Sequence, residues 1–109
     1  MVSEHHRLWH IDAARVAGGV HSITNPGSRG TAVGKAGPLD AKTERLVKLA
    51  LAVGGGLQGA VRSHARRGLA AGLTQDELLH VALLGITTVG WPTAFAGRSW
   101  IQEELQRQH

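Results

Sequence analysis

Glycines divide the chain into segments in which apolar residues have a helical spacing, and this division constrains the fold most strongly. Between the glycine groups, apolar side chains recur at intervals of three and four residues, as on an amphipathic helix. Helices are expected to end at the glycines of 18–19, 54–56 and 72, because glycine tolerates the backbone angles that a helix end requires. No β-branched run alternates with polar residues, so the sequence predicts an all-α fold.

Local signals place about five helices along the chain. We expect them over residues 3–17, 40–53, 57–71, 74–89 and 92–109. The clearest boundary is at Thr74, since Glu77 three residues later completes a capping box. Pro92 is typical of the first turn of a helix, where its missing N–H would have no partner anyway.

The segment of residues 20–37 separates the first expected helix from the other four. It is rich in Gly, Ser, Thr, Asn and Pro and shows no period. A loop of this length is usually mobile, functional or packed on a neighbouring subunit. We therefore expect an N-terminal helix and loop arm over residues 1–37 and a single helical domain over residues 38–109.

The absence of cysteine narrows the possible chemistry. With no thiol in the chain, disulfides, thiolate metal sites and cysteine nucleophiles are excluded. The net charge of +4 fits a small anionic substrate, a nucleic acid or an acidic surface. Nucleic-acid binding is disfavoured, because the basic residues are scattered and no groove-reading motif is present. The charge alone does not choose between a small anionic substrate and an acidic surface.

A long stretch without acidic or basic residues other than histidine, residues 78–97, has the length of a membrane span. It contains several threonines and glycines and a helix break at Gly90 and Pro92, so we interpret it as two buried helical pieces joined by a turn. The polar N-terminus shows no secretory signal. We therefore expect a cytoplasmic protein that does not enter a membrane.

His64 is the strongest candidate for proton transfer. It shares one face of its predicted helix with Leu57, Ala60, Val61 and Gly68, at spacings of three and four residues. A buried imidazole is either a hydrogen-bonded core residue or an acid–base group whose pKa is moved towards the working pH by burial. The residues alone leave both interpretations open.

Three further polar side chains are candidates. Arg62 lies on another face of the same helix and could bind a carboxylate through paired hydrogen bonds, or form a solvated or inter-subunit contact. Glu44 is spaced to pair with Lys48 on a helix surface, or could work with the imidazole. His80, which stands between apolar neighbours, is a second pocket candidate or a satisfied core residue.

No metal or cofactor is expected. His6 and His10 are one helical turn apart, but no acidic third ligand accompanies them on that face. The glycine-rich segment 54–59 lacks the preceding strand that a dinucleotide-binding fingerprint needs.

Three motifs occur in order along residues 39–98. They are Leu-Asp-Ala-Lys-Thr-Glu-Arg-Leu at 39–46, Arg-Ser-His-Ala-Arg-Arg-Gly at 62–68, which precedes the capping box, and Gly-Trp-Pro-Thr-Ala-Phe at 90–95. With this spacing the chain resembles the carboxymuconolactone decarboxylase and alkylhydroperoxidase D-like family. The resemblance implies an alkylhydroperoxidase D-like helical bundle that assembles as a homo-oligomer, a trimer or hexamer.

Peroxidase members of that family carry Cys-x-x-Cys-x-x-x-His on the third helix. In this chain His64 keeps the histidine place, while Leu57 and Ala60 fill the two cysteine places, so a thiol redox cycle is impossible. The resemblance therefore points to the decarboxylase branch, whose Arg-Ser-His resembles residues 62–64. Members of that branch often carry a histidine in the fourth helix, where this chain has Leu84.

The resemblance implies a cofactor-free lyase whose partner is a small anionic substrate, a carboxylate or lactone, on which it acts by proton transfer. His64 would move the proton and Arg62 would anchor the carboxylate, with His80 or Glu44 assisting. Contacts to the substrate would come from Trp91, Leu57, Ala60 and Leu84. The alternative is a non-catalytic member of the same family, either a homo-oligomeric scaffold or a small-ligand-binding protein.

Overall fold

The computed structural model describes residues 32–107. The chain divides into two units, residues 1–41 and residues 42–109, and each is considered by itself. In the first unit, residues 32–34 form a helical turn, and the N–H of Ala36 donates to the carbonyl oxygen of Val33 over 3.1 Å. The expected helix over residues 3–17, and the loop as far as residue 31, lie outside the described residues.

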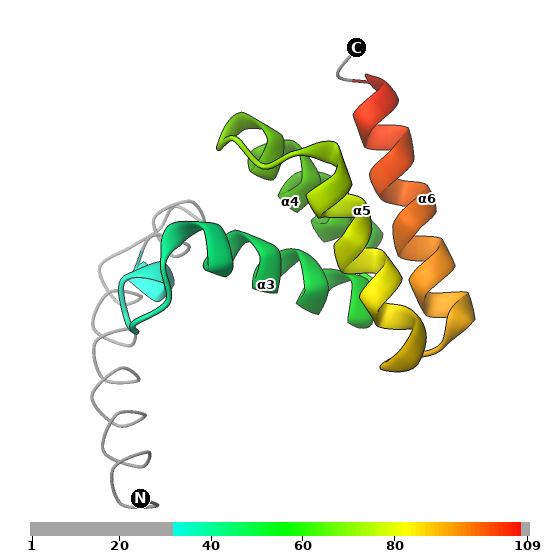
Figure 1. Ribbon diagram of the computed structural model, residues 1–109, viewed down its shortest axis with the longest axis horizontal. Helices are drawn as coiled ribbons and strands as arrows, with labels where there is room; N and C mark the ends of the chain where they lie inside the picture. Colours follow the sequence, from blue (N-terminus) through cyan, green and yellow to red (C-terminus); the bar gives the residue numbers. More distant parts are fainter. Residues whose placement is uncertain (1–31, 108–109) are drawn as a thin grey trace, which may run out of the picture. The chain divides into compact units, whose positions relative to one another are not determined.

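Helices make up the regular structure of the described chain (Figure 1). They are α3 (Ala41–Gly54), α4 (Gln58–Ala70), α5 (Gln75–Leu84), the 3₁₀ helix η1 (Gly85–Thr87) and α6 (Trp91–Arg107). Residues 32–107 contain no strand, which confirms the predicted all-α class. The four expected helices in this range are present, with boundaries that differ mainly at the end of α5.

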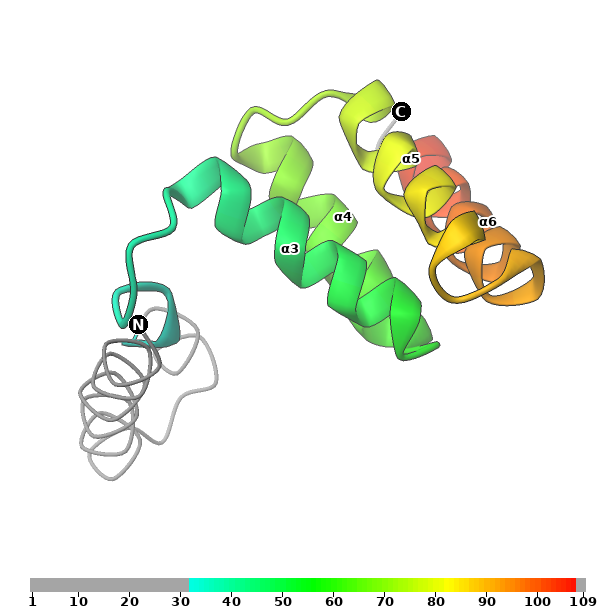
Figure 2. The same cartoon turned by 60° about the horizontal axis from the view of Figure 1, so that its bottom comes forward.

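The core lies among α3, α4, α5 and α6, and both α4 and α5 lie along α6 (Figures 1 and 2). Its largest fully buried apolar side chains come from all four helices: Leu49, Val61, Leu78 and Ile101. The fully buried residues of α3 lie in its C-terminal half. Ala52 faces the core beside Leu49 and Val53, whereas Ala50 is exposed.

Positive-φ glycines end α3 and α4 in the same way. Gly72 has φ of 99°, its N–H donates to the carbonyl of Leu69, and the N–H of Leu73 donates to the carbonyl of Gly68. These two bonds are the Schellman motif, which satisfies carbonyls left open at a helix end. After α3, Gly56 has φ of 66° and the motif is repeated, so the backbone of Leu57 is fixed by a hydrogen bond to the carbonyl of Ala52.

The predicted capping box at the start of α5 is confirmed. The N–H of Glu77 donates to Oγ1 of Thr74 over 3.0 Å, and the N–H of Thr74 donates to Oε1 of Glu77 over 2.9 Å. Oε2 of Glu77 also lies 2.6 Å from Nζ of Lys42, so the cap connects α5 to the first turn of α3. The ammonium of Lys42 and the backbone N–H of Thr74 lower the pKa of the Glu77 carboxyl.

Helix α5 is shorter than the sequence predicts. It ends at Leu84 rather than near residue 89, and the chain continues as η1. The hydroxyl of Thr88 donates to the carbonyl of Leu84, which competes with the helical hydrogen bonds there. Gly90, with φ of 94°, then turns the chain into α6.

No helix of the described residues is long and apolar enough to cross a membrane. The stretch of residues 78–97, which has the length of a span, is divided among α5, η1 and α6.

Candidate functional site

His64 lies half-buried in the middle of α4, among positively charged side chains. Burial lowers the pKa of its imidazole from 6.5, and the charges of Arg67, Lys48 and Arg45 lower that pKa further. Both effects disfavour the imidazolium ion, because a cation loses hydration on burial and is repelled by its neighbours. Both effects therefore favour the neutral imidazole, which can accept a proton.

The charges around the imidazole come from two helices. Arg45 and Lys48 lie on α3, and Arg67 lies one turn after His64 on α4. We call His64, Arg45, Lys48 and Arg67 together the basic cluster. Oε1 of Glu44 lies 3.1 Å from Nζ of Lys48 and neutralises that ammonium in part. Glu44 offsets only the charge of Lys48. The guanidinium groups of Arg45 and Arg67 therefore keep a positive field, which favours an anion near the imidazole.

Arg62 is directed towards α6. Its guanidinium lies 2.5 Å from the carboxylate of Glu103, and its side chain is 21% exposed. One turn later, Arg66 pairs with Glu104 over 3.2 Å. These two ion pairs join α4 to α6, so Arg62 already has a carboxylate partner within the chain.

Most of the other sequence-predicted residues lie on the surface. His80 and Leu84 are exposed on α5, and Leu57 is 55% exposed in the turn before α4. Ala60, half-buried one turn before His64, packs against the core. The apolar neighbours of His80 in the sequence suggested a pocket or core residue, but its side chain is exposed to solvent.

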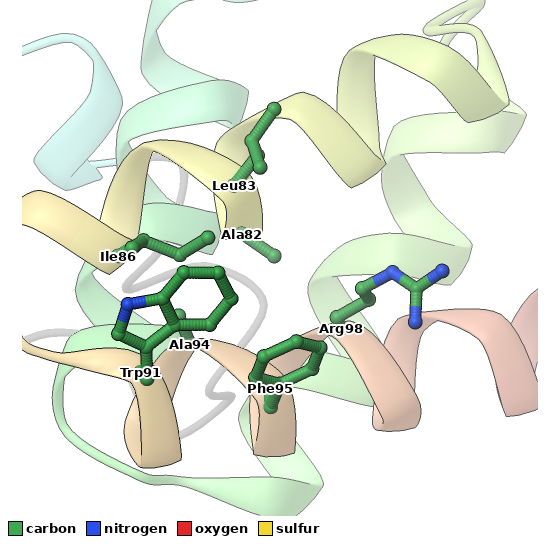
Figure 3. Close-up of a pocket in the computed structure, with 7 residues that line it drawn as sticks. All are labelled: Ala82, Leu83, Ile86, Trp91, Ala94, Phe95 and Arg98. Atoms are coloured by element: carbon green, nitrogen blue, oxygen red, sulfur yellow. The ribbon is translucent and has the colours of Figure 1, made fainter.

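A pocket of about 300 Å³ opens between α5, η1 and α6 (Figure 3). It is lined by Ala82, Leu83, Ile86, Trp91, Ala94, Phe95 and Arg98. Trp91 is the predicted substrate contact that lines it, and no member of the basic cluster does. The rings of Trp91 and Phe95 are stacked, with centroids 5.1 Å apart and planes inclined by 23°.

Sequence reasoning missed several of these residues. Arg45 and Lys48 are three residues apart on one predicted helix, a spacing that marks a shared face, but their proximity to His64 depends on how α3 crosses α4. The sequence contains a clearer pattern for the residues that line the pocket. Trp91, Phe95 and Arg98 follow a spacing of four and then three residues, which places them in one row along a helix.

Within residues 32–107, no group of three or more His, Asp or Glu side chains could hold a metal ion. His6 and His10, the histidine pair considered from the sequence, lie outside these residues.

The sequence pattern of the Carboxymuconolactone decarboxylase family matches residues 28–103 of the chain. This range contains the three motifs described above, the capping box, His64 and the whole pocket. No curated protein and no solved structure matches the chain.

Proposed function

Because the chain belongs to the carboxymuconolactone decarboxylase family, we propose that it is a cofactor-free lyase that removes CO₂ from a small anionic carboxylate or lactone. The observation that carries this proposal is the half-buried His64 beside Arg45, Lys48 and Arg67. A neutral imidazole among fixed cations combines a proton carrier with an anion-binding field, and both are needed for this reaction.

In the proposed complex, the substrate carboxylate binds to the basic cluster. A guanidinium can hold a carboxylate through two parallel hydrogen bonds, so Arg45 and Arg67 supply the strongest contacts. Arg62, the anchor favoured by the sequence, is engaged by Glu103 and receives no substrate contact in this proposal. Glu44 acts through Lys48, whose ammonium it holds near the imidazole.

The reaction breaks the bond between the carboxylate carbon and its neighbour, and CO₂ leaves. The electron pair of that bond moves into the unsaturated lactone of the substrate, which acts as the electron sink. His64 takes up a proton from solvent and delivers it to the substrate carbon, so that one proton replaces one CO₂. A lowered pKa makes the imidazolium a stronger acid and favours this transfer.

Apolar groups beside the imidazole complete the proposed site. Ala60 precedes His64 by one turn on α4, and Leu57 is the residue directly before that helix begins. They would contact the hydrocarbon part of a small substrate and reduce the water around the reacting bond. His80 and Leu84, exposed on α5, are assigned no step.

Turnover of unsaturated carboxy-lactones tests this proposal. CO₂ release and the loss of lactone absorbance are followed for the wild type, for His64→Ala and for Gln58→Ala. The control replaces an exposed residue at the start of the same helix. We expect the control to match the wild type and His64→Ala to lose at least about 100-fold in kcat, the usual contribution of acid–base catalysis. Equal turnover in all three proteins would end the catalytic assignment and favour the non-catalytic alternative.

Assembly belongs to the same proposal. Large apolar side chains on the second unit are exposed, among them Leu51 at 69% and Leu84 at 58%. Burial between subunits would remove such side chains from water, which is consistent with the expected trimer or hexamer. Sedimentation of the full chain measures the assembly directly.

A further inference from the structure

The pocket between α5 and α6 has two unlike walls and a charged end. Leu83 and Ile86 form one wall, while the stacked rings of Trp91 and Phe95 form the other (Figure 3). Arg98 follows Phe95 along α6, so the guanidinium lies at the end of the aromatic row (Figure 3). The volume of about 300 Å³ is at the lower end of the range for small-molecule sites.

Arg98 differs from the other arginines near α6. Arg62, Arg66 and Arg107 each pair with a glutamate, whereas in the part of the chain that the structure describes Arg98 has no carboxylate within ion-pair distance. It is also the single charged residue among those that line the pocket. An unpaired guanidinium at the end of an apolar pocket is complementary to an anion that carries a hydrophobic body.

From this arrangement we propose a second binding site, separate from the basic cluster, for a small aromatic carboxylate. Its ring packs against Trp91 and Phe95 and its carboxylate pairs with Arg98. A planar ring gains from offset stacking on an aromatic side chain beyond the area that it buries. The proposal does not depend on the proposed function, because none of these residues belongs to the basic cluster.

Two probes of one shape test the charge requirement. Cinnamate and cinnamyl alcohol share a planar aromatic skeleton, and only cinnamate carries a carboxylate. Calorimetric titration of the full chain should show saturable binding of cinnamate and an affinity about tenfold weaker for the alcohol, in line with a charge-assisted hydrogen bond. Arg98→Gln should reduce the affinity for cinnamate to that of the alcohol.

Separate controls test the effect of losing one arginine charge and the place where cinnamate binds. Arg62→Gln removes the same charge at a residue that pairs with the exposed Glu103 and does not line the pocket, and it should leave the affinity for cinnamate unchanged. Indole N–H resonances of the three tryptophans report the location, with Trp91→Phe assigning the signal of Trp91. Cinnamate should shift that resonance in the wild type, in Arg67→Gln and in His64→Ala, so failure of the catalytic proposal leaves this result standing.

Three results would overturn the proposal. Equal affinity for the acid and the alcohol would remove the role of Arg98. Loss of cinnamate binding in Arg67→Gln but not in Arg98→Gln would place the anion at the basic cluster. Absence of binding by either probe, with a decrease in sedimentation mass when Leu83 is changed to Gln, would show that a second copy of the chain covers the pocket.

Discussion

Gly97 of α6 lies directly against Val53 of α3. A methyl group built at Gly97 would come within 2.7 Å of Cγ1 of Val53 and within 2.9 Å of its Cγ2. Both residues are buried, so α3 and α6 approach each other at this point only because one of them has no side chain. This contact fixes the end of α3 against the long final helix.

Gly97→Ala should therefore destabilise the fold by about 1–3 kcal/mol, the usual cost of overpacking a core. Gly59→Ala is the matched control, since a methyl group at that exposed position of α4 meets nothing within 4 Å. The control should leave the free energy of unfolding unchanged, or raise it by up to about 1 kcal/mol through helix propensity. Urea titration followed by circular dichroism measures both, and equal stabilities would contradict the close contact.

The buried carboxylate of Glu104 gives a second prediction, in which removing its arginine partners costs more stability than removing its own charge. Its side chain is 1% exposed and lies near the guanidinium groups of Arg66 and Arg107, which are both exposed. Replacing both arginines with Gln leaves a buried charge without a partner, which should cost about 3–5 kcal/mol. Glu104→Gln should cost less, because the arginines that remain are solvated.

The neighbouring pair of Arg62 and Glu103 controls for the general effect of charge between α4 and α6. Glu103 is more than half exposed, so Glu103→Gln should change the free energy of unfolding by about 0–1 kcal/mol. A loss at Glu103 as large as that of the Arg66 and Arg107 double variant would contradict the role given to burial.

The pKa of His64 gives a prediction for stability against pH. Folding lowers this pKa below 6.5, so below that pH the unfolded chain binds more protons than the folded one. The wild type should therefore lose stability relative to His64→Gln as the pH falls from about 6.5 through the lowered folded pKa, with no further relative loss below it. Unfolding free energies of the two proteins that differ by a constant at every pH would contradict a lowered pKa.

The cause of that shift can be tested at one neighbour. Arg67→Gln should raise the midpoint of the His64 imidazole titration, measured by NMR, because Arg67 contributes the largest charge effect after burial. Arg107→Gln removes the same charge at a residue that pairs with Glu104, and it should leave the midpoint unchanged. Equal shifts in both variants would indicate a general effect of net charge.

The capping box gives a local prediction. Thr74→Ala removes the hydroxyl that accepts from the N–H of Glu77, and the loss of such a cap costs about 1 kcal/mol. Thr87→Ala, at an exposed position in η1, is the matched control and should have little effect. Thermal unfolding measures both, and a lower midpoint in Thr87→Ala than in Thr74→Ala would contradict the capping role.

Helix boundaries could be predicted from the sequence where a single local interaction decides them. Gly72 and Thr74 are such cases, because a Schellman motif and a capping box involve only residues that are close in the chain. The end of α5 was predicted less well. Apolar residues continue to Val89, but the hydroxyl of Thr88 donates to the carbonyl oxygen of Leu84 and competes there with the helical hydrogen bond.

The candidate site was only partly predictable. The inward side of α4 correctly suggested that His64 is at least half-buried. The partner of Arg62 could not be read from the sequence, because Glu103 lies 41 residues away and meets it only through the packing of α4 on α6. The same applies to Arg45 and Lys48, whose approach to the imidazole depends on the crossing of α3 and α4.

The two ion pairs between α4 and α6 can form together at only one rotation of the final helix about its axis. Glu103 and Glu104 are consecutive, so their side chains leave α6 about 100° apart, yet each meets an arginine on α4, at Arg62 and Arg66. A helix turns about its axis as one piece, and a rotation that kept one of these contacts would break the other. Trp91 lies about three turns earlier on the same helix, so the direction in which it points follows from that same rotation.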